Sequence, residues 1–236
     1  MLILKIKRGK MKTEEFKKYK AHYISSIRKV WANSKSKAFY EAAFPAYSNA
    51  NPLINFLFWQ RIRVAINYIE QNGPFEMVLD FGCGSGVMLP FLAGMSRKVV
   101  AVDIDFSPIE QIKSYATFPD NIEFQDANEI YSGRFQNGTF DVVVALDVLE
   151  HVDDLDKTLR QICDLLKPGG RLVVSAPTEN IFYKVGRWIA GSDYSGEFHE
   201  RGSKEIRQAM SSIMKVEQVA TLYYPSPLFE VFVGIN

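Results

Sequence analysis

Between residues 75 and 177 the chain repeats one pattern, in which a short apolar run precedes a polar or helical stretch. The apolar runs are F-E-M-V-L-D-F, K-V-V-A-V-D-I-D, N-I-E-F-Q-D, F-D-V-V-V-A-L-D and R-L-V-V-S-A-P. Strands that are apolar on both faces and separated by helices are typical of a parallel sheet covered on both sides. The pattern therefore predicts an α/β fold with a doubly wound sheet.

The C-terminal tail departs from this pattern. It contains two strand-like runs, I-M-K-V-E-Q-V-A-T-L-Y-Y-P and L-F-E-V-F-V-G-I-N, joined at Pro225-Ser226-Pro227. Because this connection is too short for a crossover helix, we expect the last two strands to be antiparallel.

The N-terminal part lacks strand patterns and predicts helices. Asn51-Pro52 is a typical helix start, and Gln71-Asn72-Gly73-Pro74 a typical helix end. We therefore expect a basic arm and helical cap over residues 1–72 and a sheet domain over 73–236. An insertion at about residues 178–203 follows the fifth strand, at the edge where α/β sites open.

Charge is unevenly distributed along the chain. The first forty residues hold 12 Lys and Arg against 2 Asp and Glu, a net of +10; the rest holds 16 against 25, a net of −9. A basic arm suits an anionic partner such as a lipid surface, RNA or a phosphorylated substrate, with a solvated helix face as the alternative. The sequence predicts no metal ligands and no oligomeric state.

Cysteine usage bears on the compartment. Cys83 and Cys163 form no disulfide framework and favour reduced thiols in the cytoplasm. The opening M-L-I-L-K-I-K is too short for a signal peptide, and Met11 is an alternative start to Met1. We expect a cytoplasmic protein, with peripheral contact between its basic arm and an anionic membrane as a further hypothesis.

The run V-L-D-F-G-C-G-S-G, residues 78–86, places three glycines between a strand and a helix. Glycines let the backbone approach a ligand closely, with free N–H groups facing it. A dinucleotide-binding loop has the spacing G-x-G-x-x-G, but Val87 stands where that spacing needs glycine. Asp80 would repel a pyrophosphate and attract a positive charge. The loop therefore favours a ligand other than a dinucleotide.

Five motifs stand in order between residues 75 and 177: D-F-G-C-G-S-G, V-A-V-D-I-D, F-Q-D-A, F-D-V-V-V-A-L-D-V-L-E-H-V and L-L-K-P-G-G-R-L-V-V-S-A-P. In order and spacing they resemble the class I S-adenosylmethionine-dependent methyltransferases (type 11-like). The resemblance implies a Rossmann-like, seven-stranded, mostly parallel sheet whose last strand is antiparallel. It implies S-adenosylmethionine as cofactor, S-adenosylhomocysteine as product, and a small-molecule or lipid-like acceptor methylated at oxygen or nitrogen.

The resemblance also implies roles for residues at the carboxyl ends of the first four strands. For the methionine part of the cofactor it implies lining by Gly82, Gly84 and Gly86 and, at the ammonium group, by Asp80. For the ribose hydroxyls it implies Asp103 as acceptor, and beside the adenine it implies Ile104. For the adenine amino group it implies Asp126 as acceptor, with Ala127 next to it. At the sulfonium it implies Leu146 and Asp147 as the border. Asp105 is the alternative to Asp103, and Asp126 is alternatively a turn residue.

Residues for the acceptor are less distinct. Methyl transfer needs a base only when the acceptor must lose a proton, and the candidates are His151 and His199. The insertion around His199 contributes further candidates for substrate contact, Tyr183, Arg187, Tyr194 and Glu197, whose alternative is a solvated lid.

The helical cap adds candidates of its own. Arg61 and Arg63 are candidates for an anionic group of cofactor or substrate. Phe56, Phe58 and Trp59 are either core residues or a lipid-binding groove.

Three other functions are weighed against the methyltransferase. A non-catalytic S-adenosylmethionine-binding protein or partner-dependent subunit would share all five motifs. An NAD-dependent oxidoreductase conflicts with Asp80 and Val87. An RNA methyltransferase is disfavoured because the chain has no recognisable RNA-binding module, so nucleic acid is an unlikely partner.

Overall fold

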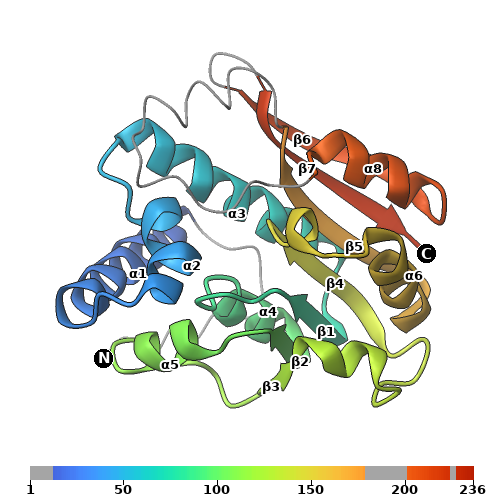
Figure 1. Cartoon of the computed structure of the whole chain (residues 1–236), viewed down its shortest axis with the longest axis horizontal. Helices are drawn as coiled ribbons and strands as arrows, with labels where there is room; N and C mark the ends of the chain where they lie inside the picture. Colours follow the sequence, from blue (N-terminus) through green and yellow to red (C-terminus); the bar gives the residue numbers. More distant parts are fainter. Residues whose placement is uncertain (1–12, 179–200, 224–226) are drawn as a thin grey trace.

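The structure is a computed structural model, and it describes residues 13–178, 201–223 and 227–236. In these residues one seven-stranded sheet has the order β3-β2-β1-β4-β5-β7-β6 (Figure 1). The strands are β1 Phe75–Phe81, β2 Ser96–Asp103, β3 Ile122–Asp126, β4 Phe140–Leu146, β5 Leu166–Pro177, β6 Lys215–Tyr223 and β7 Pro227–Ile235. The sequence pattern placed the start of β5 at Arg171, but the strand begins earlier, at Leu166. Its register with β4 is irregular between Phe140 and Val142.

Strand direction agrees with the sequence pattern. β1 to β5 pair in parallel, whereas β7 pairs antiparallel with both β5 and β6. The doubly wound, mostly parallel sheet and the antiparallel final strand are thereby confirmed. The site that the glycine loop predicts lies at the carboxyl ends of β1, β2 and β4.

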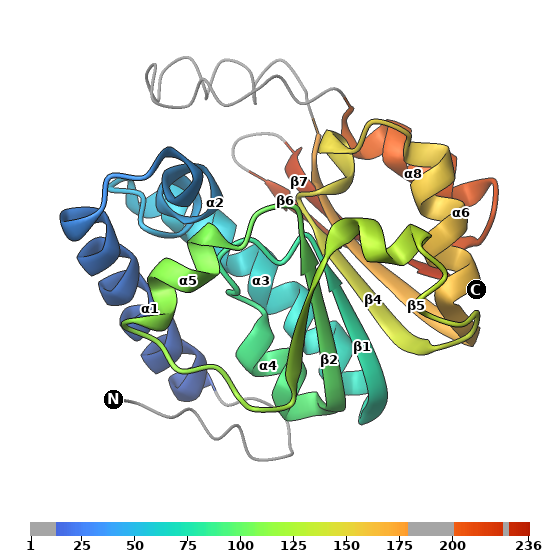
Figure 2. The same ribbon diagram turned by 60° about the horizontal axis from the view of Figure 1, so that its bottom comes forward.

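Helices cover both faces of the sheet, as Figure 2 shows. One face carries α1 Thr13–Asn33, α2 Lys37–Tyr47, α3 Pro52–Asn72, α4 Leu89–Met95 and α5 Ser107–Lys113. The other carries the short helix η1 Ala127–Tyr131, α6 Leu155–Leu165 and α8 Ser203–Ser211. Alternate strand residues enter the two cores, so Val78 lies in the first and Leu79 in the second. Between β4 and α6, η2 spans Leu149–His151.

The boundaries of α3 illustrate how the sequence sets its local structure. Asn51 caps the helix, since its side chain accepts hydrogen bonds from the N–H groups of Leu53 and Ile54. Pro52 occupies the first turn, where its missing N–H costs nothing, and Gly73 follows the last helical residue. No helix in the described ranges is long and apolar enough to cross a membrane.

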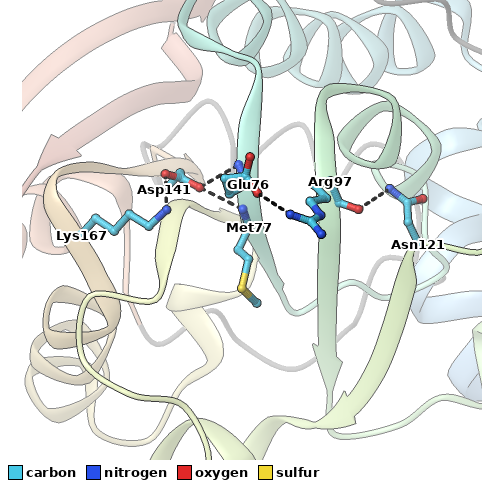
Figure 3. A network of polar contacts seen from close by, with 6 residues as sticks. All are labelled: Glu76, Met77, Arg97, Asn121, Asp141 and Lys167. Atoms are coloured by element: carbon cyan, nitrogen blue, oxygen red, sulfur yellow. Dashed lines mark hydrogen bonds and ion pairs between the residues drawn. The ribbon is translucent and has the colours of Figure 1, made fainter.

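At the amino edge of the sheet, opposite the glycine loop, a polar network ties three strands together (Figure 3). Asp141 of β4 accepts hydrogen bonds from the backbone N–H groups of Glu76 and Met77 in β1, both at 2.9 Å. Its other carboxylate oxygen accepts from Lys167 of β5 at 2.7 Å. Burial alone would raise the pKa of Asp141, but these hydrogen bonds outweigh it and leave the pKa below its usual value.

Candidate functional site: an acid-flanked glycine loop

The glycine loop, residues 82–86, leaves β1 and turns against β2. The N–H groups of Gly82 and Cys83 donate to the carbonyl of Val102 at 2.9 and 3.1 Å, and that of Gly84 donates to Oδ2 of Asp103 at 2.7 Å. Our expectation that the loop's N–H groups face a ligand is wrong for these three residues. The neighbouring strand satisfies them, as buried backbone donors require.

The first two glycines of the loop are required for different reasons, although both have a positive φ. At Gly82 a Cβ would lie 2.4 Å from Cγ2 of Val148, so neighbouring packing already excludes a side chain. At Gly84 the nearest atom would be the Ala42 carbonyl oxygen, 3.9 Å away. A side chain at Gly84 would therefore enter the space that we expect the ligand to occupy.

Asp80 lies beneath this loop at the end of β1. It is only 4% exposed, and its Oδ2 has no hydrogen-bond partner among the described residues. Burial, together with the negative charge of Asp103, raises the pKa of Asp80 to about 7. A buried acid next to a second acid favours a positively charged ligand group between them.

The structure distinguishes Asp103 from Asp105. Asp105 is engaged at the start of α5, where its carboxylate accepts from the N–H and the hydroxyl of Ser107, both at 2.8 Å. Asp103 instead faces the loop, and its Oδ1 accepts from the N–H of Asp105 at 3.2 Å. The arrangement supports Asp103 as the predicted ribose acceptor, a role that remains a prediction.

The predicted adenine side is open. Ile104 is 84% exposed, so its apolar side chain is accessible for contact with a planar ring. Asp126 ends β3, is exposed, and accepts from the N–H of Asn128 at 2.8 Å, so it also acts as the turn residue that we weighed. Ala127 begins η1 beside it. These three residues follow neighbouring strand ends, as predicted.

The end of β4 is held by a network that sequence reasoning missed. Asp147 has a φ of 53°, its Oδ1 accepts from the hydroxyl of Ser175 at 2.7 Å, and its Oδ2 is ion-paired with Arg61. Arg61 is 1% exposed and lies over the rings of Phe58 and Phe229 at 4.8 and 5.1 Å. Leu146, the residue before Asp147, packs against the first core. This network places Arg61 beside the predicted sulfonium border.

The N-terminal helices also hold the glycine loop. Tyr23 of α1 donates to the carbonyl and the hydroxyl oxygen of Ser85, at 3.0 and 2.8 Å, and Tyr19 donates to the carbonyl of Val87 at 2.8 Å. The hydroxyl of Ser85 in turn donates to the Ala42 carbonyl of α2 at 3.3 Å. Sequence reasoning missed this clamp because Tyr23 and Ser85 are 62 residues apart and no motif links them.

The remaining candidates of the cap differ in their contacts and exposure. Arg63 donates to the hydroxyl of Thr13 and lies over the Phe16 ring at 5.8 Å, away from the Arg61 network. Trp59 is a core residue that donates to the Tyr47 carbonyl. Phe56 is 54% exposed, so the alternative that all three aromatic residues are core is wrong for it.

The acceptor candidates are mostly beyond the described residues. His151 ends η2 just after β4 and is exposed. The catalytic candidate His199 and nearly all of the predicted insertion lie outside the described ranges. So do the four candidates for substrate contact, Tyr183, Arg187, Tyr194 and Glu197. Within those ranges no group of three or more His, Cys, Asp or Glu side chains could hold a metal ion.

Comparison with known proteins decides the family. A family model described as a methyltransferase domain matches residues 53–216, well over half of the chain. The chain belongs to this methyltransferase family. The resemblance to class I methyltransferases is thereby confirmed, and the match begins at the start of α3, so α1 and α2 lie outside it.

Individual relatives agree with this assignment. A ubiquinone biosynthesis O-methyltransferase of Coxiella burnetii is 32% identical over 149 residues, which are 61% of this chain and 62% of the relative. Its counterpart from Colwellia psychrerythraea is 30% identical over 141 residues, 58% and 57% of the two chains. The match thus spans about three fifths of these relatives. The crystal structure of the N-methyltransferase NodS from Bradyrhizobium japonicum shares the fold at a TM-score of 0.59, with 17% identity over 89% of this chain and 98% of that one.

Proposed function

We propose that this methyltransferase uses S-adenosylmethionine to methylate a hydroxyl oxygen of a small-molecule or lipid-like acceptor. One observation carries the cofactor assignment: two acids from adjacent strands, Asp80 and Asp103, flank a glycine loop with open space at Gly84. Two acids suit a cofactor with a positively charged end and a ribose diol, because carboxylates accept two hydrogen bonds each. The relatives from Coxiella burnetii and Colwellia psychrerythraea are both named O-methyltransferases, which supports oxygen as the acceptor atom.

When bound, the cofactor would supply a methyl group on a positively charged sulfur, and the sulfur would leave as the acceptor oxygen takes the methyl group. The residues of this chain orient the two reactants and exclude water. Asp147, fixed by Arg61 and Ser175, lies where the positive sulfur is predicted. The acceptor hydroxyl would lose its proton to a base as it takes up the methyl group, and His151 and His199 are the candidates for that base.

The basic arm supports a lipid-like acceptor at a membrane surface. The exposed face of α1 carries Lys17, Lys18, Arg28 and Lys29. We propose that this face brings a cytoplasmic protein to anionic lipid, since such charges attract anionic headgroups within a Debye length. Flotation with vesicles tests this: binding to anionic but not zwitterionic vesicles supports it, and equal recovery with both contradicts it.

Methyl transfer is tested with methyl-labelled S-adenosylmethionine and matched acceptor pairs. Each pair offers a hydroxyl compound and its amino analogue, both free in solution and with a lipid tail in vesicles. We expect label in the hydroxyl products, and less of it with Asp103→Asn, which should weaken cofactor binding. Label confined to the amino analogues would contradict oxygen as the acceptor atom. Tight cofactor binding without label in any product would favour a non-catalytic or partner-dependent protein.

A further inference from the structure

Asp80 occupies a position that is costly for a negative charge. Its side chain is 4% exposed, and Oδ2 has no hydrogen-bond partner within the described part of the chain. Burying an ionised carboxylate without a compensating partner is unfavourable, so such a group either finds a positive charge or stays protonated. The site therefore needs one of these two solutions whenever it is empty.

The groups that face Asp80 come from the elements packed around it, and in the described residues they bring no positive charge. Those with an electrostatic effect on Asp80, or affected by it, are Asp103 of β2, Tyr23 of α1, Tyr47 of α2 and Cys83 of the loop. The buried cation of α3, Arg61, is ion-paired with Asp147 at the end of β4. Hence none of these neighbouring groups supplies a positive charge that would balance an ionised Asp80 before a ligand binds.

We propose that Asp80 carries a proton in the empty site and releases it when the positively charged amino group of the cofactor or its product enters. This inference rests on the proposed function and adds pH control of cofactor binding. On binding, the carboxyl O–H bond breaks, the proton passes to the buffer, and the ammonium group balances the carboxylate charge. The same burial and the same Asp103 charge raise the pKa of Asp80 to about 7.

The sign of the pH dependence follows from linkage. An ammonium ligand favours ionised Asp80, so affinity rises with pH until the carboxyl is already ionised in the empty protein. With a pKa of about 7, roughly a tenth of the empty protein is ionised at about pH 6. We therefore expect S-adenosylhomocysteine to bind about tenfold more weakly at about pH 6 than at about pH 8.

Calorimetric titration of S-adenosylhomocysteine measures the proton directly. Repeating each titration in buffers with different protonation enthalpies gives the number of protons released. We expect about one proton per site at about pH 6 and close to none at about pH 8. S-adenosylhomocysteine that binds at both pH values without proton release would overturn the inference and leave the proposed function intact. Failure to bind at either pH would contradict the proposed function itself.

Two variants assign the proton to its residue. Asp80→Asn cannot titrate, so it should release no proton and should bind with one affinity at both pH values, below the wild-type affinity at the lower pH. Asp120→Asn removes an exposed acid just before β3, at the amino edge of the sheet, and should behave like wild type. Unchanged proton release in Asp80→Asn would contradict the assignment. The wild-type proton count decides the inference even if Asp80→Asn does not fold.

Discussion

Gly82 and Gly84 have opposite roles in the structure, and alanine substitution separates them. At Gly82 the left-handed φ costs alanine about 1–2 kcal/mol, and a Cβ 2.4 Å from Val148 adds an overpacking cost of about 1–3 kcal/mol. Gly82→Ala should therefore lower the free energy of unfolding by about 2–5 kcal/mol, a large share of a typical domain's stability of about 5–15 kcal/mol. At Gly84 only the φ cost of about 1–2 kcal/mol applies.

Ligand binding should show the reverse order. A methyl group at Gly84 projects into the space predicted for the cofactor, so Gly84→Ala should weaken S-adenosylhomocysteine binding more strongly than it weakens the fold. Urea unfolding of the ligand-free protein and calorimetric titration measure the two effects separately.

A double-mutant cycle tests the steric part of this account. Val148→Ala removes the two methyl groups that a Cβ at Gly82 would meet but keeps its own Cβ at 2.7 Å, so it should recover part of the overpacking cost of about 1–3 kcal/mol. Equal destabilisation by alanine at Gly82 and Gly84, or no coupling between Gly82 and Val148, would refute the reasoning.

Three further predictions concern the supporting contacts. Arg61→Met should lower the free energy of unfolding by about 2 kcal/mol or more, because it leaves the charge of Asp147 without its buried partner; urea unfolding measures this, and an unchanged midpoint would count against the network. Tyr23→Phe removes both hydrogen bonds to Ser85 but keeps the ring, so we expect a loss of about 1–2 kcal/mol and weaker S-adenosylhomocysteine binding; thermal unfolding and calorimetry check this, and unaltered affinity would show that the clamp does not position the loop. The pKa of Asp141 is lowered, so its contribution to stability is present above the usual aspartate pKa and is lost as the pH falls through the lowered pKa. Asp141→Asn should therefore destabilise the protein at neutral pH but hardly in acid, as urea unfolding at the two pH values measures; an equal loss of unfolding free energy at both would refute this.

Much of the fold could be predicted because its determinants are local. Alternation of apolar strands with helices specified the parallel sheet, and the short Pro225-Ser226-Pro227 connection specified the antiparallel end. Asn51 and Pro52 marked the start of α3 through their own capping chemistry. Such features depend on residues within a few positions of one another, so a single sequence contains them.

The contacts that complete the candidate site depend on tertiary packing and could not be predicted in this way. The bonds from Tyr23 to Ser85 and from Arg61 to Asp147 join elements far apart in the sequence, and no spacing rule relates them. We expected the N–H groups of Gly82 and Cys83 to face a ligand, but they donate to the Val102 carbonyl of the neighbouring strand. The sequence does not show that this carbonyl lies beside the loop.

The central claim is that the acid-flanked glycine loop holds S-adenosylmethionine, and calorimetric titration of S-adenosylhomocysteine into the wild type and Asp103→Ala tests it most directly. The account predicts saturable one-to-one binding by the wild type and a loss of at least about tenfold in affinity in the variant, since charge-assisted hydrogen bonds contribute about 1.5–3 kcal/mol each. Far-UV circular dichroism of the variant establishes that its fold is retained. Absence of binding in the wild type, or equal affinity in the two proteins, would contradict the account.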